Sequence, residues 1–153
     1  MTIRPKTVVT MKLEGHAASH ARTDISVRDL EVVIDEPEAR GGTNQGPSPT
    51  ETLMAALIGC TNVITHKIAH KHGIEIKSLD VRVETQFDRR GVSLEEEIAV
   101  PFPEIKLIVD LTTDASPEAV EMVKTELAKF CPVSKVLRQS GTVITEEWNV
   151  TPA

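Results

Sequence analysis

Apolar positions along the chain fall into short β-type runs near both ends and two longer stretches with helical spacing. Residues 7–13, a run within 16–26, and 30–34 predict three early strands joined by short connections, as in an antiparallel meander. Alternation of apolar and polar residues predicts a long strand over 74–90 with a bulge near Lys77-Ser78. Two further strands are predicted at 105–111 and 142–150.

A long central helix is predicted over 50–72, after the glycine- and proline-rich segment 40–49. Ser48 and Glu51 have capping-box spacing, Pro49 suits the first helical position, and Gly73 suits the position after the last turn. The first half of this helix is apolar on nearly every side. Such a helix is expected to be buried, either in a core or between subunits.

A second helix is predicted from Ser116-Pro117 onward, with Cys131-Pro132 interrupting it before a short third helix. Its apolar face would contain Val120, Val123, Leu127 and Phe130. The order is therefore βββ-α-ββ-α-α-β. Strands grouped apart from helices indicate an α+β fold with antiparallel sheets, and 153 residues suit one domain over 1–153.

Composition narrows the possible functions. The net charge is −6 without a basic tract, and aromatic residues are only 3%, so a nucleic-acid partner is not expected. The longest apolar candidate, 53–64, is interrupted by polar residues and is shorter than a membrane span of about 20 residues. The N-terminus has no signal-peptide pattern, so a cytoplasmic location and no membrane partner are expected.

The two cysteines have different predicted environments. Cys131 precedes Pro132 and is a candidate helix N-cap, where the helix dipole and nearby Lys135 would lower a thiol pKa. Cys60 lies inside an apolar helix, where desolvation would raise its pKa unless a cation were brought from elsewhere. The residues alone leave open an inert pair or a redox pair.

Two segments resemble motifs of the OsmC/Ohr family. Residues 41–62, GGTNQGPSPTETLMAALIGCTN, resemble the entry into the family's central helix, and FCPVSKVL at 130–137 resembles its second cysteine motif. The sequences of these two segments are more similar to the OsmC-like branch of the family than to typical Ohr proteins. The resemblance implies an OsmC-like fold with a long buried central helix, an intertwined homodimer, and stress-related reduction of organic hydroperoxides.

The resemblance also implies roles for particular residues. Cys60 would be the attacking thiolate and Cys131 the resolving thiol, with a dithiol reductant, such as a lipoylated protein, restoring both. Glu51 would hold an active-site arginine, for which Arg22 is the best match, Arg28 the second and Arg40 the third. Leu53, Met54 and Leu57 would line an apolar substrate pocket. No cofactor or metal is implied.

One spacing departs from the family, and two other functions remain open. Glu51 and Cys60 are nine residues apart, where typical Ohr proteins have ten, and nine residues place them on opposite helix faces unless a first-turn distortion or a π-bulge intervenes. Glu51 is also explained by its capping role alone. A non-enzymatic relative could bind a small apolar ligand, and His66, His70 and His72 could hold zinc, although a solvated helix end explains them better.

Overall fold

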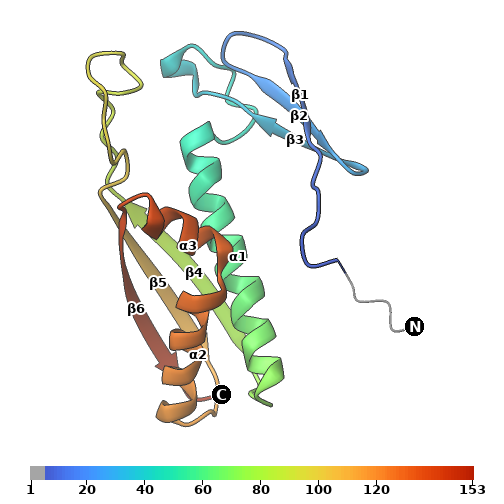
Figure 1. Ribbon diagram of the computed structural model, residues 1–153, viewed down its shortest axis with the longest axis vertical. Helices are drawn as coiled ribbons and strands as arrows, with labels where there is room; N and C mark the ends of the chain where they lie inside the picture. Colours follow the sequence, from blue (N-terminus) through green and yellow to red (C-terminus); the bar gives the residue numbers. More distant parts are fainter. Residues whose placement is uncertain (1–5) are drawn as a thin grey trace. The chain divides into compact units, whose positions relative to one another are not determined.

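The computed structural model describes residues 6–153 and divides into two compact units, one up to Leu53 and one from Met54 on (Figure 1). The elements follow the predicted order βββ-α-ββ-α-α-β, so the α+β class is confirmed. The expectation of a single domain over 1–153 stays a prediction.

The first unit contains a three-stranded antiparallel sheet in the order β1-β2-β3. Its strands are β1 (Glu14–Ala17), β2 (Thr23–Val27) and β3 (Leu30–Ile34), so the predicted run 16–26 divides between two strands. The prediction of a strand at 7–13 was wrong. These residues pair with nothing in the described chain, and Val8 is 85% exposed. Without a neighbouring strand, β-type composition alone does not produce one.

A buried carboxylate organises the loop that follows β3. Asp35 is fully buried and accepts hydrogen bonds from the Thr43 hydroxyl at 2.6 Å, the Thr43 amide at 3.1 Å and the Gln45 amide at 3.0 Å. The loop lies so close to the preceding chain that a Cβ added to Gly46 would be only 2.1 Å from the Val33 carbonyl oxygen. The short 3₁₀ helix η1 (Glu38–Arg40) lies within this connection.

The long helix α1 (Pro49–Lys71) begins and ends as predicted. The Glu51 carboxylate accepts from the Ser48 amide at 2.8 Å, and the Ser48 hydroxyl accepts from the Glu51 amide at 3.3 Å, which completes the capping box. At the other end, Gly73 has φ +67°, and the Ile74 amide reaches back to the Ala69 carbonyl at 2.9 Å.

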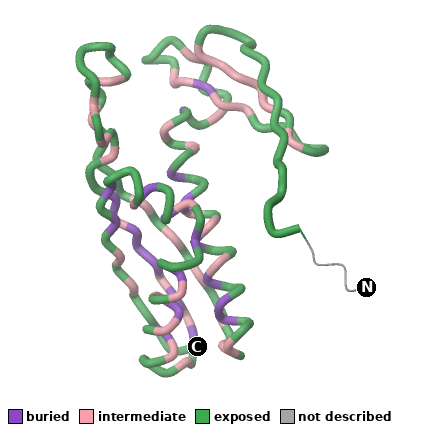
Figure 2. The backbone as a smooth tube through the Cα atoms, viewed as in Figure 1, coloured by how far each residue is buried: buried purple, intermediate pink, exposed green. Residues whose placement is uncertain are grey.

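Within the chain, α1 is buried along one side rather than all round (Figure 2). The buried residues are Met54, Leu57, Thr61, Thr65, Ile68 and Ala69. Contrary to the sequence-based expectation, α1 is long and apolar enough to cross a membrane by length and composition. Core helices pass the same test, and the buried side of α1 packs against other parts of the second unit.

The second unit is built on a sheet of β4 (Ser78–Thr85), β5 (Glu104–Thr112) and β6 (Val143–Thr151). β4 and β5 are antiparallel, but β5 and β6 are parallel, which differs from the antiparallel sheets predicted. Parallel neighbours need a long crossover connection, and α2 (Pro117–Phe130) with α3 (Pro132–Gln139) provides it.

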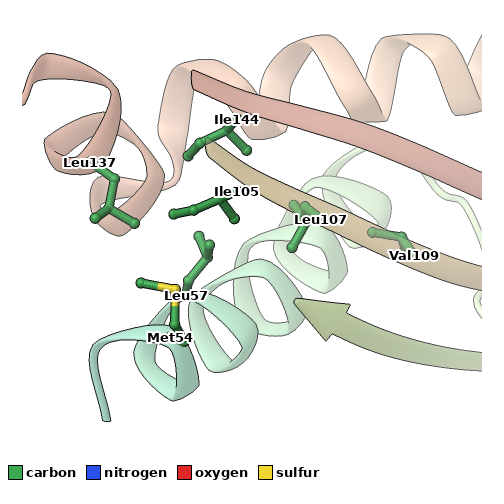
Figure 3. Packing of buried hydrophobic residues seen from close by; sticks show 7 residues of the cluster. All are labelled: Met54, Leu57, Ile105, Leu107, Val109, Leu137 and Ile144. Atoms are coloured by element: carbon green, nitrogen blue, oxygen red, sulfur yellow. The ribbon is translucent and has the colours of Figure 1, made fainter. Parts of the chain in front are cut away.

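One face of this sheet forms the core. Alternate residues Ile105, Leu107 and Val109 of β5 are almost completely buried, and Leu57 of α1 points toward Ile105 (Figure 3). Met54 of α1, Leu137 of α3 and Ile144 of β6 complete the cluster. Met54 and Leu57 are core residues here, whereas Leu53 is exposed, and the apolar ligand pocket that the resemblance implied for these three residues stays a prediction.

The opposite face of the sheet is mostly polar, although it includes Ile108 of β5, which is 5% exposed. Arg82 pairs with Asp110 at 2.6 Å, Lys106 with Glu147 at 2.7 Å, and Asn149 donates to Asp110 at 2.8 Å. These residues alternate with the core positions along each strand, as expected for a sheet covered on one side.

The apolar face predicted for α2 needs one correction. Val120, Val123 and Leu127 are buried, but Phe130 is 58% exposed. The next buried position is Cys131, four residues after Leu127. The Cys131 amide donates a hydrogen bond to the Leu127 carbonyl at 2.9 Å. The buried side of α2 therefore leads into the cysteine and not into the aromatic residue.

We expect Leu57→Ala to lower the free energy of unfolding by about 2–5 kcal/mol, because it removes a fully buried side chain and leaves a cavity against Ile105. Urea denaturation measures this loss. Leu94→Ala is the matched control, since Leu94 is 93% exposed, and it should change the unfolding free energy by about 0.5 kcal/mol or less. Equal losses for the two variants would contradict the assigned core.

We expect Asp35→Asn to destabilise the protein at neutral pH and to matter less in acid. Hydrogen bonding by Thr43 holds the pKa of Asp35 below its ordinary value, despite burial. A lowered folded-state pKa gives stability that is present above the unfolded-state pKa and is lost as pH falls through the folded-state pKa. Melting temperatures of both proteins should therefore converge in acid. Asp29→Asn, at an exposed turn position, is the control, and a constant difference at every pH would refute the explanation.

Candidate functional site

Two thiols from distant parts of the sequence meet in the second unit. Cys60 lies in the middle of α1, and Cys131 is the single residue between α2 and α3. Both are free; Cys131 is completely buried and Cys60 partly buried. They share a cluster with Ile68, Val123 and Leu127, and the neighbouring Cys131 raises the pKa of the Cys60 thiol. The sequence had left open whether the two cysteines meet.

The position of Cys131 follows from Pro132. Proline has no amide hydrogen and disfavours a helical residue before it, so α2 ends and Cys131 takes an extended conformation with φ −70° and ψ 108°. Its carbonyl accepts from the Lys135 amide at 3.1 Å and the Ser134 hydroxyl at 3.2 Å. Cys131 is thus the N-cap residue of α3, as predicted, but its side chain makes no capping hydrogen bond.

The environment of Cys60 disfavours ionisation. Burial raises the pKa of the Cys60 thiol above its ordinary value, as predicted from its place in an apolar helix. A hydrogen bond from the Val133 backbone N–H lowers this pKa, the neighbouring Cys131 raises it, and the charge of Lys67 lowers it. The first-turn amides of a helix have no partners within the helix, so Val133 of α3 is free to donate to Cys60.

Val133 and Lys67 are the neighbours of Cys60 that sequence reasoning missed. The start of α3 at Pro132 was expected to lower the pKa of Cys131, whereas the Val133 backbone amide of α3 lowers the pKa of Cys60. Lys67 follows Cys60 by seven residues, close to two helical turns, so helical spacing could have identified it. The contact of Val133 depends on tertiary packing and has no local signal.

The other predicted site residues lie in the first unit, and each has a partner there. Arg22 forms a two-pronged contact with Asp24, through Nε at 2.7 Å and Nη2 at 3.3 Å. Glu51 bonds the Ser48 amide, and this bond is the main reason that its pKa is lowered. The structure therefore does not form the Arg22–Glu51 contact that the resemblance implied, and the catalytic roles of both residues stay predictions.

The two alternative arginines are also in the first unit. Arg28 has φ +57° in the turn between β2 and β3. Arg40 pairs with Glu36 at 2.6 Å, and its charge contributes to the lowered pKa of Glu51. Of the three candidate arginines, Arg40 is the one whose charge acts on Glu51. Because α1 is regular from Pro49 to Lys71, it contains no π-bulge to compensate for the nine-residue spacing between Glu51 and Cys60.

The side chains of His66 on α1 and His72 just after α1 each have a partner. His66 Nδ1 lies 3.0 Å from the Asn62 carbonyl oxygen, and His72 Nε2 lies 2.9 Å from Glu126 Oε1 on α2. Across residues 6–153, no group of three or more His, Cys, Asp or Glu side chains is placed to hold a metal ion.

These features define an α+β protein with a paired-thiol site formed by a central helix and a helix–helix junction. The family described as OsmC-like protein matches residues 42–147, which include both cysteines. The chain belongs to the OsmC-like protein family. A search of curated proteins gives no match to this chain.

Solved structures show the same fold at low sequence identity. A hypothetical protein from Aquifex aeolicus VF5 has a TM-score of 0.77 and 18% identity, over 95% of this chain and 99% of that one. An OsmC-like protein from Mycoplasma pneumoniae has a TM-score of 0.73 and 16% identity, over 95% and 98%. The organic hydroperoxide resistance protein OhrB of Bacillus subtilis has a TM-score of 0.57 and 21% identity, over 94% and 98%.

We expect Lys67→Ala to shift the pH profile of Cys60 alkylation by iodoacetamide to higher pH. The lysine charge favours the thiolate, so its removal raises the pKa of Cys60 and slows alkylation near neutral pH. Mass spectrometry of the Cys60 peptide follows the rate. Lys135→Ala, on the first turn of α3, is the control and should leave the profile in place. A profile unchanged by Lys67→Ala would show that Lys67 does not act on the thiol.

Proposed function

We propose that the protein is a two-cysteine peroxidase that reduces organic hydroperoxides to alcohols in oxidative-stress defence. The observation that carries the proposal is the meeting of Cys60 and Cys131 in one apolar cluster. Membership of the OsmC-like family supports it, and so does the fold shared with the organic hydroperoxide resistance protein OhrB.

The chemistry needs no bound group. The Cys60 thiolate attacks one peroxide oxygen and breaks the O–O bond, which leaves a sulfenic acid and an alkoxide that takes up a proton to become the alcohol. The Cys131 thiol then condenses with the sulfenic acid, which forms the Cys60–Cys131 disulfide and releases water. A dithiol reductant, such as a lipoylated protein, exchanges with the disulfide and restores both thiols.

The first step requires ionised Cys60, although burial raises its pKa. In the second unit the Val133 amide and Lys67 favour the thiolate. In this proposal an arginine of the first unit adds to them, with Arg22 as the first candidate and Arg28 and Arg40 as alternatives. A guanidinium stays charged even where it is desolvated, which suits it to this role. Glu51 would orient that guanidinium.

The proposal also includes an assembly and a location. The chain would act as a homodimer in the cytoplasm, without nucleic-acid or membrane partners. Exposed apolar residues are consistent with a dimer: Val9 and Met11 before β1 are 72% and 83% exposed, and Val63 on the outer side of α1 is 48% exposed.

The second candidate function is non-enzymatic binding of a small apolar ligand. The raised pKa of Cys60 favours this alternative, because a protonated thiol is a poor nucleophile. The two candidates differ in what happens to the thiols when an alkyl hydroperoxide is added.

The deciding experiment mixes the reduced protein with one equivalent of tert-butyl hydroperoxide and counts free thiols by mass spectrometry after rapid alkylation. We expect the wild type to lose two thiols per peroxide consumed. Cys60→Ser should reduce peroxide consumption to the uncatalysed rate. Cys131→Ser should consume one equivalent, accumulate a trappable sulfenic acid on Cys60, and fail to form an intramolecular disulfide.

Two results would change the assignment. If the wild type keeps both thiols in excess hydroperoxide, the enzymatic proposal is wrong and ligand binding remains. If Cys131→Ser blocks the first oxidation while Cys60→Ser permits it, the cysteine roles are reversed.

A further inference from the structure

A group of side chains on β6 contacts both helices that flank Cys131. Glu146 Oε2 accepts the indole N–H of Trp148 at 2.9 Å, and Glu146 Oε1 accepts from Arg138 Nη2 of α3 at 3.2 Å. Lys124 of α2 lies over the Trp148 ring, 5.9 Å from its centroid. We call Lys124, Arg138, Glu146 and Trp148 the β6 bracket.

The bracket lies on the core side of the sheet. Glu146 and Trp148 occupy alternate positions of β6 with Ile144, and Trp148 packs against both hydrophobic clusters, including the one that contains Cys131. Val133 of α3 packs against the same two clusters. The indole therefore packs against the cluster that contains Cys131, at the α2–α3 junction.

Arg138 attaches α3 to β6 at two points. Its Nη1 donates to the Ile144 carbonyl at 3.0 Å, in addition to the Glu146 contact, while its buried Nε has no hydrogen-bond partner among residues 6–153. Only 19% of the Glu146 side chain is exposed, so this contact is largely shielded from solvent. Charge-assisted hydrogen bonds of this kind are stronger than neutral ones and are directional.

The two sulfurs differ in how they can adjust during disulfide formation. Cys60 lies within a regular 23-residue helix, whereas Cys131 is one extended residue between two helices. The position of the Cys131 sulfur therefore depends on how α2 and α3 are held. We propose that the β6 bracket sets the position of Cys131, with Glu146 and Trp148 as positioning residues for closure of the Cys60–Cys131 disulfide.

This inference deepens the proposed function, on which its biological meaning rests, but its test uses no hydroperoxide. The reduced protein is equilibrated with mixtures of oxidised and reduced dithiothreitol. Forming the Cys60–Cys131 bond transfers two electrons and two protons to oxidised dithiothreitol, which opens to its dithiol form. Alkylation and mass spectrometry give the fraction of disulfide and thus the equilibrium constant for closure.

We expect Glu146→Gln to lower this equilibrium constant about tenfold, because one oriented charge-assisted contact is lost and the reduced state samples more positions of Cys131. Trp148→Phe keeps an aromatic ring but loses the N–H bond, and it should lower the constant in the same direction. Glu147→Gln is the matched control. It removes the ion pair with Lys106 at the next residue of the same strand, on the other face of the sheet, and should leave the constant within about twofold.

Thermal unfolding of the reduced proteins shows whether each variant is folded before the comparison. If Glu146→Gln does not fold, Trp148→Phe tests the inference in its place. The inference is overturned if Glu146→Gln and Trp148→Phe match the wild type, or if Glu147→Gln lowers the constant equally. A wild type that closes its disulfide in dithiothreitol but ignores hydroperoxide would refute the proposed function and leave the bracket intact. If the wild type consumes hydroperoxide and the bracket variants close their disulfide as readily as the wild type, the inference about the bracket is refuted and the proposed function is kept.

Discussion

The site depends on the packing of α1 against β5 and α2. Leu57 against Ile105 and Ile68 against Val123 and Leu127 fix the buried side of the helix, and with it the direction of Cys60. The second of these clusters includes Cys131, and Cys60 packs against it, so hydrophobic burial brings together two sulfurs that lie far apart in the sequence. Both cysteines are free in this arrangement.

The burial that brings the two sulfurs together also disfavours ionisation of the Cys60 thiol. An apolar cluster favours the neutral thiol, and the pKa of Cys60 is raised accordingly. In the second unit, the Val133 backbone amide and the charge of Lys67 lower the pKa of Cys60. Reactivity at neutral pH therefore depends on how much further positive potential reaches Cys60. In the first unit, the candidate Arg22 is held by Asp24.

Local rules predicted local features well. The capping box of Ser48 and Glu51, the helix end at Gly73, and the break at Pro132 each depend on residues within a few positions, and each is present in the structure. Features that require a partner elsewhere were missed. Residues 7–13 have strand composition but no neighbouring strand, and the parallel pairing of β5 with β6 depends on the crossover through α2 and α3. The effect of the Val133 amide on the pKa of Cys60 depends on how α3 packs, so no sequence pattern predicts it.

The junction between α2 and α3 consists of one residue, and this has a consequence for variation in chain length. Each residue added to a helix rotates all later positions of that helix by about 100° around its axis. An insertion or deletion between Leu127 and Cys131 would rotate the sulfur of Cys131 out of the shared cluster, because α2 runs directly into Cys131 with no loop to absorb the change. The connection between β4 and β5, over residues 86–103, contributes no residue to the cluster that holds the thiols.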